Sequence, residues 1–79
     1  MWWLYEKISE DASIVIYGYA RESYDCTGKI VFDKAKDSVI EFQYCDNDKN
    51  KFDRDVAIDK FAYFVANKGY PERRRVVCG

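Results

Sequence analysis

The 79-residue sequence contains no histidine. Histidine is the most common general base and a frequent zinc ligand, so its absence removes Ser–His and Cys–His catalysis and the ordinary zinc sites. The three cysteines, Cys26, Cys45 and Cys78, are an odd number without a C-x-x-C pair. They argue against a disulfide scaffold and suit a reducing cytoplasm. We therefore expect no catalytic residue, no metal and no cofactor.

Glycine is scarce, with four residues, and none of them forms a phosphate-binding loop, a G-x-S-x-G motif or a G-x-G-x-x-G motif. Asp46-x-Asp48-x-Asn50 matches the start of an EF-hand loop. The match then fails, because Lys51 stands where that loop needs glycine and Ala57 where it needs glutamate. We interpret the segment as a loop that caps a helix, and we expect a binding protein and not an enzyme.

The N-terminus lacks a basic region, and the chain has no long apolar run. We expect neither a signal peptide nor a membrane span, and hence a cytoplasmic protein. The formal net charge of −1 gives no overall attraction to nucleic acid or to an anionic membrane. Residues 1–50 carry ten acids and six bases, whereas residues 51–79 carry four acids and seven bases. We interpret this asymmetry as compensated within the fold.

Aromatic residues are abundant, since 2 Trp, 7 Tyr and 5 Phe make up 18% of the chain. Seven tyrosines do not all fit deep in a small core, because each buried hydroxyl needs a hydrogen-bond partner. Several tyrosines are therefore expected at the surface or at an interface. The length suffices for a single domain, residues 1–79, and is too short for two.

Alternating apolar segments predict strands over residues 2–8, 13–22, 29–33 and 38–45. Short loops separate them, which indicates an antiparallel meander. A helix is predicted from about Asp53 to Lys68, because Gly69 and Pro71 are typical of a helix end. Residues 73–77 are expected to form a short fifth strand or an extended tail. The expected fold is α+β: a four-stranded antiparallel meander sheet packed on one C-terminal helix.

The second predicted strand is apolar on both faces, which is more than a single-sheet domain needs. One face would consist of Ile14, Ile16, Gly18 and Ala20. The opposite face would consist of Val15, Tyr17, Tyr19 and Arg21. We assign the first face to the core, because its two small residues would let the helix approach closely. The helix would cover that face with Ala57, Ile58, Phe61, Ala62, Phe64 and Val65.

If the first two strands form a hairpin, an aromatic surface is expected on the solvent side of the sheet. It consists of Trp3, Tyr5, Tyr17, Tyr19 and Arg21. Three interpretations of this surface are open, and we give them in descending order of weight. The aromatic residues form cross-strand pairs that only stabilise the sheet, or they lie under the terminal segment. They form an interface with a protein partner or a second copy, or they form a platform for single-stranded nucleic acid. Lys7 would support the last interpretation, whereas Glu41 and the acidic first half oppose it.

A second candidate surface is a narrow stripe on the helix, made of Phe52, Val56 and Tyr63. It lies opposite the main apolar face. One interpretation is that Phe52 tucks under the helix and that Val76 or Val77 packs over the stripe. The other interpretation is dimerisation through the helix, and the sequence does not favour either.

A basic cluster, Arg73, Arg74 and Arg75, follows the helix. In an extended segment, alternate arginines point to opposite faces, so at most Arg73 and Arg75 act together. We expect a solvated segment that pairs with acids such as Asp33 and Asp37. Phosphate binding is the second interpretation.

Three stretches give the chain a resemblance to a group of short bacterial proteins of unassigned function. They are the start through Tyr5-Glu6-Lys7, then Tyr17-Gly18-Tyr19-Ala20-Arg21-Glu22, and the end Gly69-Tyr70-Pro71-Glu72-Arg73-Arg74. The resemblance implies no activity. Four strands followed by a helix is also similar, in topology alone, to the dimeric single-strand-binding coactivator and Whirly folds. We predict a small protein-interaction or self-associating domain. The alternatives are a single-stranded nucleic-acid binder and an inhibitor of a larger host or phage enzyme.

Overall fold

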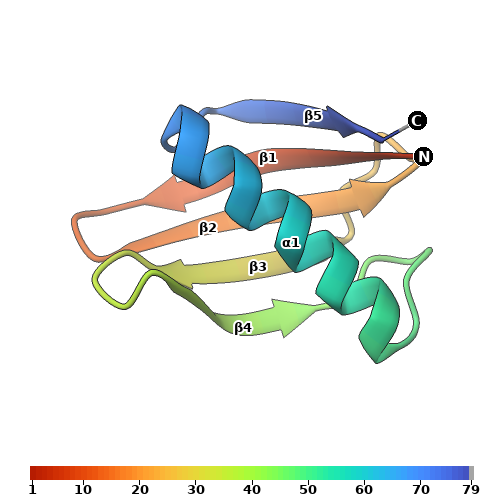
Figure 1. Ribbon diagram of the computed structural model, residues 1–79, viewed down its shortest axis with the longest axis horizontal. Coiled ribbons are helices and arrows are strands. Elements are labelled where there is room, and N and C mark those ends of the chain that lie inside the picture. Colours follow the sequence, from red (N-terminus) through yellow and green to blue (C-terminus); the bar gives the residue numbers. More distant parts are fainter. Residues whose placement is uncertain (79) are drawn as a thin grey trace.

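A five-stranded antiparallel sheet carries one helix on one of its faces in the computed structural model, which describes residues 1–78 (Figure 1). The elements are β1 (Trp2–Glu10), β2 (Ile14–Arg21), β3 (Gly28–Asp33), β4 (Ser38–Gln43), α1 (Lys51–Lys68) and β5 (Arg73–Val77). The strand order β4-β3-β2-β1-β5 confirms the predicted meander and makes the terminal segment a fifth strand beside β1. In the described chain, no helix is both long and apolar enough to cross a bilayer.

Short side chains fix the ends of the elements. The Asp11 carboxylate accepts hydrogen bonds from the N–H groups of Ser13 and Ile14 and so closes the turn between β1 and β2. Asn50 caps α1, because its side-chain oxygen accepts from the N–H of Asp53 at 3.0 Å. The Asp53 carboxylate in turn accepts from the N–H of Lys49 at 3.1 Å. The predicted capping loop is therefore present, and α1 starts two residues before the predicted position.

The helix lies on the sheet face opposite to the predicted one. Four aromatic residues assigned to solvent are each at most 2% exposed: Trp3, Tyr5, Tyr17 and Tyr19. Strand pairing places Tyr5 beside Tyr19, and the Tyr17 ring meets Phe61 and Phe64 of α1 at centroid distances of 5.3 and 5.7 Å. The prediction that this face is the outer surface is wrong, and the prediction that Ala57, Phe61 and Phe64 form the inner face of the helix is confirmed, although Ala62 is exposed.

The tyrosine hydroxyls explain why the aromatic face can be the core. Tyr5 donates to the carbonyl of Ala57 at 2.7 Å, and Tyr17 donates to the carbonyl of Pro71. A large aromatic ring gains more from burial than glycine or alanine does, provided that its hydroxyl has a partner. Burial raises the pKa of both hydroxyls above the ordinary tyrosine value, so both remain protonated donors.

The face that was assigned to the core is covered only in part, by the loop between β2 and β3. Cys26 of this loop lies over the sheet, with its sulfur 3.7 Å from the carbonyl oxygen of Leu4. A Cβ atom on Gly18 would stand 3.3 Å from the Cβ of Cys26. The small residues of β2 therefore accommodate a loop and not the helix, while Ile14 and Ile16 stay half-buried.

Candidate protein-binding surfaces

Tyr19 and Arg21, two members of the predicted aromatic surface, belong to a network of hydrogen bonds and an ion pair that connects β2 to the loop before α1. Tyr19 donates to Asp48 at 3.0 Å and accepts from the N–H of Cys45 at 3.2 Å. Arg21 Nε lies 2.8 Å from the other oxygen of Asp48, whose side chain is fully buried. Arg21 also donates to the carbonyl of Asn47, and the Asn47 amide donates back to the carbonyl of Arg21. These residues hold the loop in place and offer no aromatic platform to a partner.

The helix stripe, in contrast, is open to solvent. The side chains of Phe52 and Tyr63 are 75% and 68% exposed, and Val56 is half-buried. The interpretation in which Phe52 tucks under the helix is therefore wrong. Val77 is itself 65% exposed, and Val76 packs against the core cluster. The dimerisation interpretation stays a prediction.

The three arginines of β5 are divided among separate contacts. Arg73 Nε lies 3.4 Å from a carboxylate oxygen of Glu6, and the Arg75 guanidinium lies 4.9 Å from the ring centroid of Trp2. Arg74 pairs with Tyr5 in register and so belongs to the helix side of the sheet. The prediction that the cluster pairs with Asp33 or Asp37 is wrong, because β5 lies beside β1 and far from the loop between β3 and β4. The cluster does not form one cationic site.

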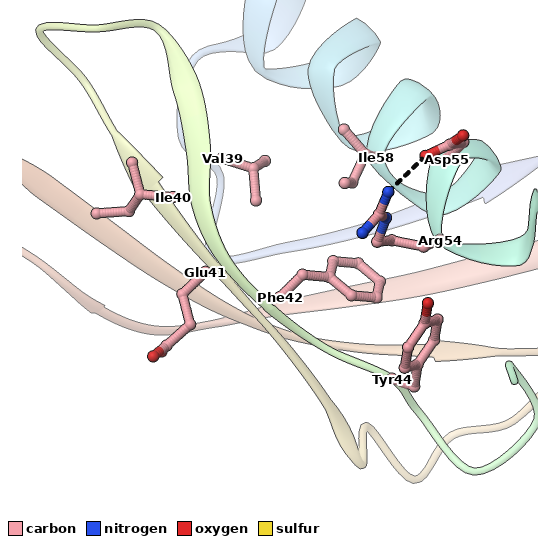
Figure 2. Close-up of a pocket in the computed structure, with 8 residues that line it drawn as sticks. All are labelled: Val39, Ile40, Glu41, Phe42, Tyr44, Arg54, Asp55 and Ile58. Carbon is pink, nitrogen blue, oxygen red and sulfur yellow. Dashed lines mark hydrogen bonds and ion pairs between the residues drawn. The ribbon is translucent and has the colours of Figure 1, made fainter. Parts of the chain in front are cut away.

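A groove that the sequence did not indicate lies between β4 and α1 (Figure 2). It is a hollow of about 430 Å³ lined by Val39, Ile40, Glu41, Phe42, Tyr44, Arg54, Asp55 and Ile58. Val39 and Phe42 point toward the helix, where Ile58 faces them, whereas Ile40 and Glu41 point to the other side of the strand. Arg54 and Asp55 form an ion pair of 3.5 Å at the rim. The groove has an apolar floor and a polar margin.

The groove follows from the mismatch between one helix and five strands. A helix is ~10 Å across, whereas five strands at ~4.8 Å spacing span almost twice that width. α1 crosses the sheet diagonally, from the end of β4 toward β5, and leaves sheet uncovered on both sides (Figure 1). An irregularity in the β3–β4 register between Val31 and Phe32 inserts Ile40 as an extra residue in β4. This bulge changes which side chains of β4 face the helix. A sequence pattern of strictly alternating inward and outward residues does not predict such a bulge.

A smaller polar hollow of about 160 Å³ lies between the β2–β3 loop and the loop before α1. Asp25, Thr27 and Asp46 line it, and the Thr27 hydroxyl accepts from the N–H of Asp46 at 2.9 Å. Across residues 1–78 there is no group of three or more acidic or cysteine side chains that could hold a metal ion.

The chain was compared with protein-family models, with curated proteins and with solved structures, and nothing matches it in any of the three. The resemblance to short bacterial proteins stays a prediction.

Proposed function

We propose that this chain is a small protein-interaction domain, not an enzyme, and that it binds an extended segment of a partner protein along β4. The observation that carries the proposal is the groove of about 430 Å³ beside an edge strand (Figure 2). β4 pairs with β3 on one side only. Its outer N–H and C=O groups are therefore available to a further strand.

A strand added to β4 would use both parts of this surface. Its backbone would pair with the outer edge of β4, and its alternate side chains would point over the groove. There they would meet Val39, Phe42 and Ile58, which favour an apolar side chain. Arg54 and Asp55 at the rim would select the polar neighbours of that side chain. Main-chain pairing gives affinity in this mode of recognition, and the groove gives specificity.

The opposite edge of the sheet is less suited to a partner strand. β5 carries three arginines in five residues, and charged side chains are a common protection of edge strands. β4 carries one charged residue, Glu41, whose side chain points away from the helix and pairs with Lys29 at 3.4 Å. β4 also exposes half of Ile40, and the bulge at this residue confines regular pairing to the parts of β4 on either side of it. These differences support β4 as the docking edge.

Ile58→Glu tests the proposal, because it places a carboxylate on the floor of the groove. Peptides of random sequence are first selected for binding to the wild-type domain, and their amide-shift changes are mapped by NMR. We expect the changes to cluster on β4 and the first turns of α1. We expect Ile58→Glu to weaken binding by at least about tenfold, since an apolar side chain would meet a charge.

Ile8→Glu is the matched control, because Ile8 is an isoleucine 63% exposed on β1, outside the groove. It should bind the selected peptides as the wild type does. Shift changes that map elsewhere, or equal binding by a folded Ile58→Glu variant, would refute docking at β4.

The single-stranded nucleic-acid alternative required an exposed aromatic platform, and Tyr5, Tyr17 and Tyr19 are buried. Inhibition of a larger enzyme stays a prediction and would use the same kind of protein contact.

A further inference from the structure

We infer that the outward stripe of α1 binds the same stripe of a second copy of the chain, with the two helices antiparallel. The stripe and the β4 groove lie on different sides of α1, so this inference does not depend on the proposed function. It rests on the spacing, the exposure and the charge pattern of the residues of α1.

The stripe has the spacing of a two-helix seam. Its members, which follow one another at intervals of four, three, four and three residues, are Phe52, Val56, Asp59, Tyr63 and Ala66. Alternating intervals of three and four residues are the spacing of the seam residues in paired, coiled-coil helices. All of them are exposed except Val56, which is half-buried. A hollow of about 320 Å³ continues the stripe toward β5, where Val76 and Val77 contribute apolar surface.

The antiparallel orientation brings the two aromatic residues of the stripe together. When Phe52 lies beside Tyr63 of the partner subunit, Val56 lies beside Asp59 of the partner subunit, and two-fold symmetry repeats each contact. A parallel pair would instead place Asp59 against its own copy, and like charges in close contact are unfavourable. In the antiparallel register the two Asp59 side chains are offset along the axis by three residues, ~4.5 Å, so the one acidic residue of the seam favours the antiparallel arrangement.

The flank of the stripe nearer the sheet is also complementary in this register. Lys60 and Asp53 lie seven residues apart on that flank. Residues on the same flank of two antiparallel helices face each other, so Lys60 comes to lie beside Asp53 of the partner subunit. Lys60 and Asp59 have no ion-pair partner within residues 1–78, whereas one oxygen of Asp53 lies 3.8 Å from the Arg21 guanidinium. Within the described chain, the Lys60 ammonium lies 5.7 Å from the ring centroid of Trp3. A second copy thus supplies two equivalent ion pairs.

A pair of opposite charges at the seam tests both the contact and its direction. Phe52→Lys and Tyr63→Glu each place a charge against an aromatic ring of the partner subunit. In a dimer of the double variant, the lysine at position 52 of each chain lies beside the glutamate at position 63 of the other chain. The two resulting ion pairs form in the antiparallel register only. Residues 52 and 63 of one chain are three helical turns apart, ~16 Å, so they cannot form this pair within one copy.

Sedimentation equilibrium of the full chain, from micromolar concentrations to about 1 mM, measures the outcome. We expect a monomer–dimer equilibrium, at least about tenfold weaker dimerisation in either single variant, and recovery in the double variant. Ile8→Lys, at an exposed site away from α1, should dimerise as the wild type does.

A wild type that is monomeric at all concentrations would overturn the inference. So would a dimer that both single variants leave intact, or a double variant no better than the single ones. Ile58→Glu should not affect dimerisation, and Phe52→Lys should not affect peptide binding, so failure at one surface is distinguishable from failure at the other.

Discussion

Tyr19 is the residue that joins the sheet to the loop before α1. Its hydroxyl donates to Asp48 and accepts from the N–H of Cys45, and both contacts are buried. Tyr19→Phe would leave the Cys45 N–H and one oxygen of Asp48 without these partners. We expect a loss of about 1–3 kcal/mol in the free energy of unfolding, measured by urea denaturation.

Tyr24→Phe is the control for this change, because the side chain of Tyr24 is 66% exposed. Its unfolding free energy should stay within about 0.5 kcal/mol of the wild type. An equally small effect of Tyr19→Phe would show that the network does not stabilise the fold.

Gly28 pairs with Tyr19 in the β2–β3 register, and the tyrosine ring lies over it. A Cβ atom at Gly28 would stand 2.2 Å from a ring carbon of Tyr19 and 2.8 Å from the backbone nitrogen of Cys45. Both the ring and the loop would have to move, so Gly28→Ala should lower the unfolding free energy by about 1–3 kcal/mol or more. Gly18→Ala is the comparison, since its closest contact would be 3.3 Å. A thermal melt in which Gly18→Ala is the more damaging change would contradict this account.

At the scale of the elements, β2 marks the limit of what alternation can predict. Its two faces could be assigned from the sequence, because successive side chains point to opposite sides. Which face meets the helix could not, because both faces are apolar. The choice depends on partners far along the chain: Ala57 and Pro71 accept from Tyr5 and Tyr17, more than fifty residues away. No local pattern carries that information.

The helix was predictable in a different way. The sequence indicated its extent to within two residues, its inner face and its second apolar stripe, because all three follow from a local period of 3.6 residues. The groove beside β4 was not predictable, since it depends on the diagonal path of α1 and on the bulge at Ile40. Candidate surfaces on one element could therefore be found from sequence, and those between two elements could not.

At the scale of the whole molecule, the two proposed contacts are compatible. The β4 groove uses Arg54, Asp55 and Ile58, and the hollow on the β5 side uses Asp59, Lys60 and Tyr63. They lie on different sides of the same helix. A dimer built on the outward stripe would therefore keep both β4 grooves open, and two-fold symmetry would present two of them to one partner. Such bivalence strengthens binding to a partner with two segments of suitable spacing.

One end of the sheet is held by an ion-pair network that joins distant parts of the chain. Glu10, at the end of β1, contacts Lys34 at 2.6 Å and Lys7 at 2.5 Å. Lys7 also reaches Glu72, just before β5, at 3.5 Å. Hydrogen bonds from Lys34 and then Lys7 lower the pKa of Glu10 below its ordinary value. The N–H groups of Ile14 and Ser13 likewise lower the pKa of Asp11.

These lowered pKa values predict acid sensitivity. A carboxyl whose pKa is lower in the folded state stabilises the fold above its unfolded pKa, about 4. That contribution is lost as the pH falls through the folded pKa. The melting temperature should therefore be steady from about pH 7 to 5 and should fall below that range.

Glu10→Gln removes the titrating group at the centre of this network. The variant should melt below the wild type at neutral pH, and the two melting temperatures should converge in acid, where the wild-type carboxyl is protonated. Glu22→Gln, at an exposed glutamate outside the described ion pairs, should instead follow the wild type throughout. If the Glu10→Gln and wild-type curves stay parallel down to about pH 2, Glu10 does not link the acid transition to the fold.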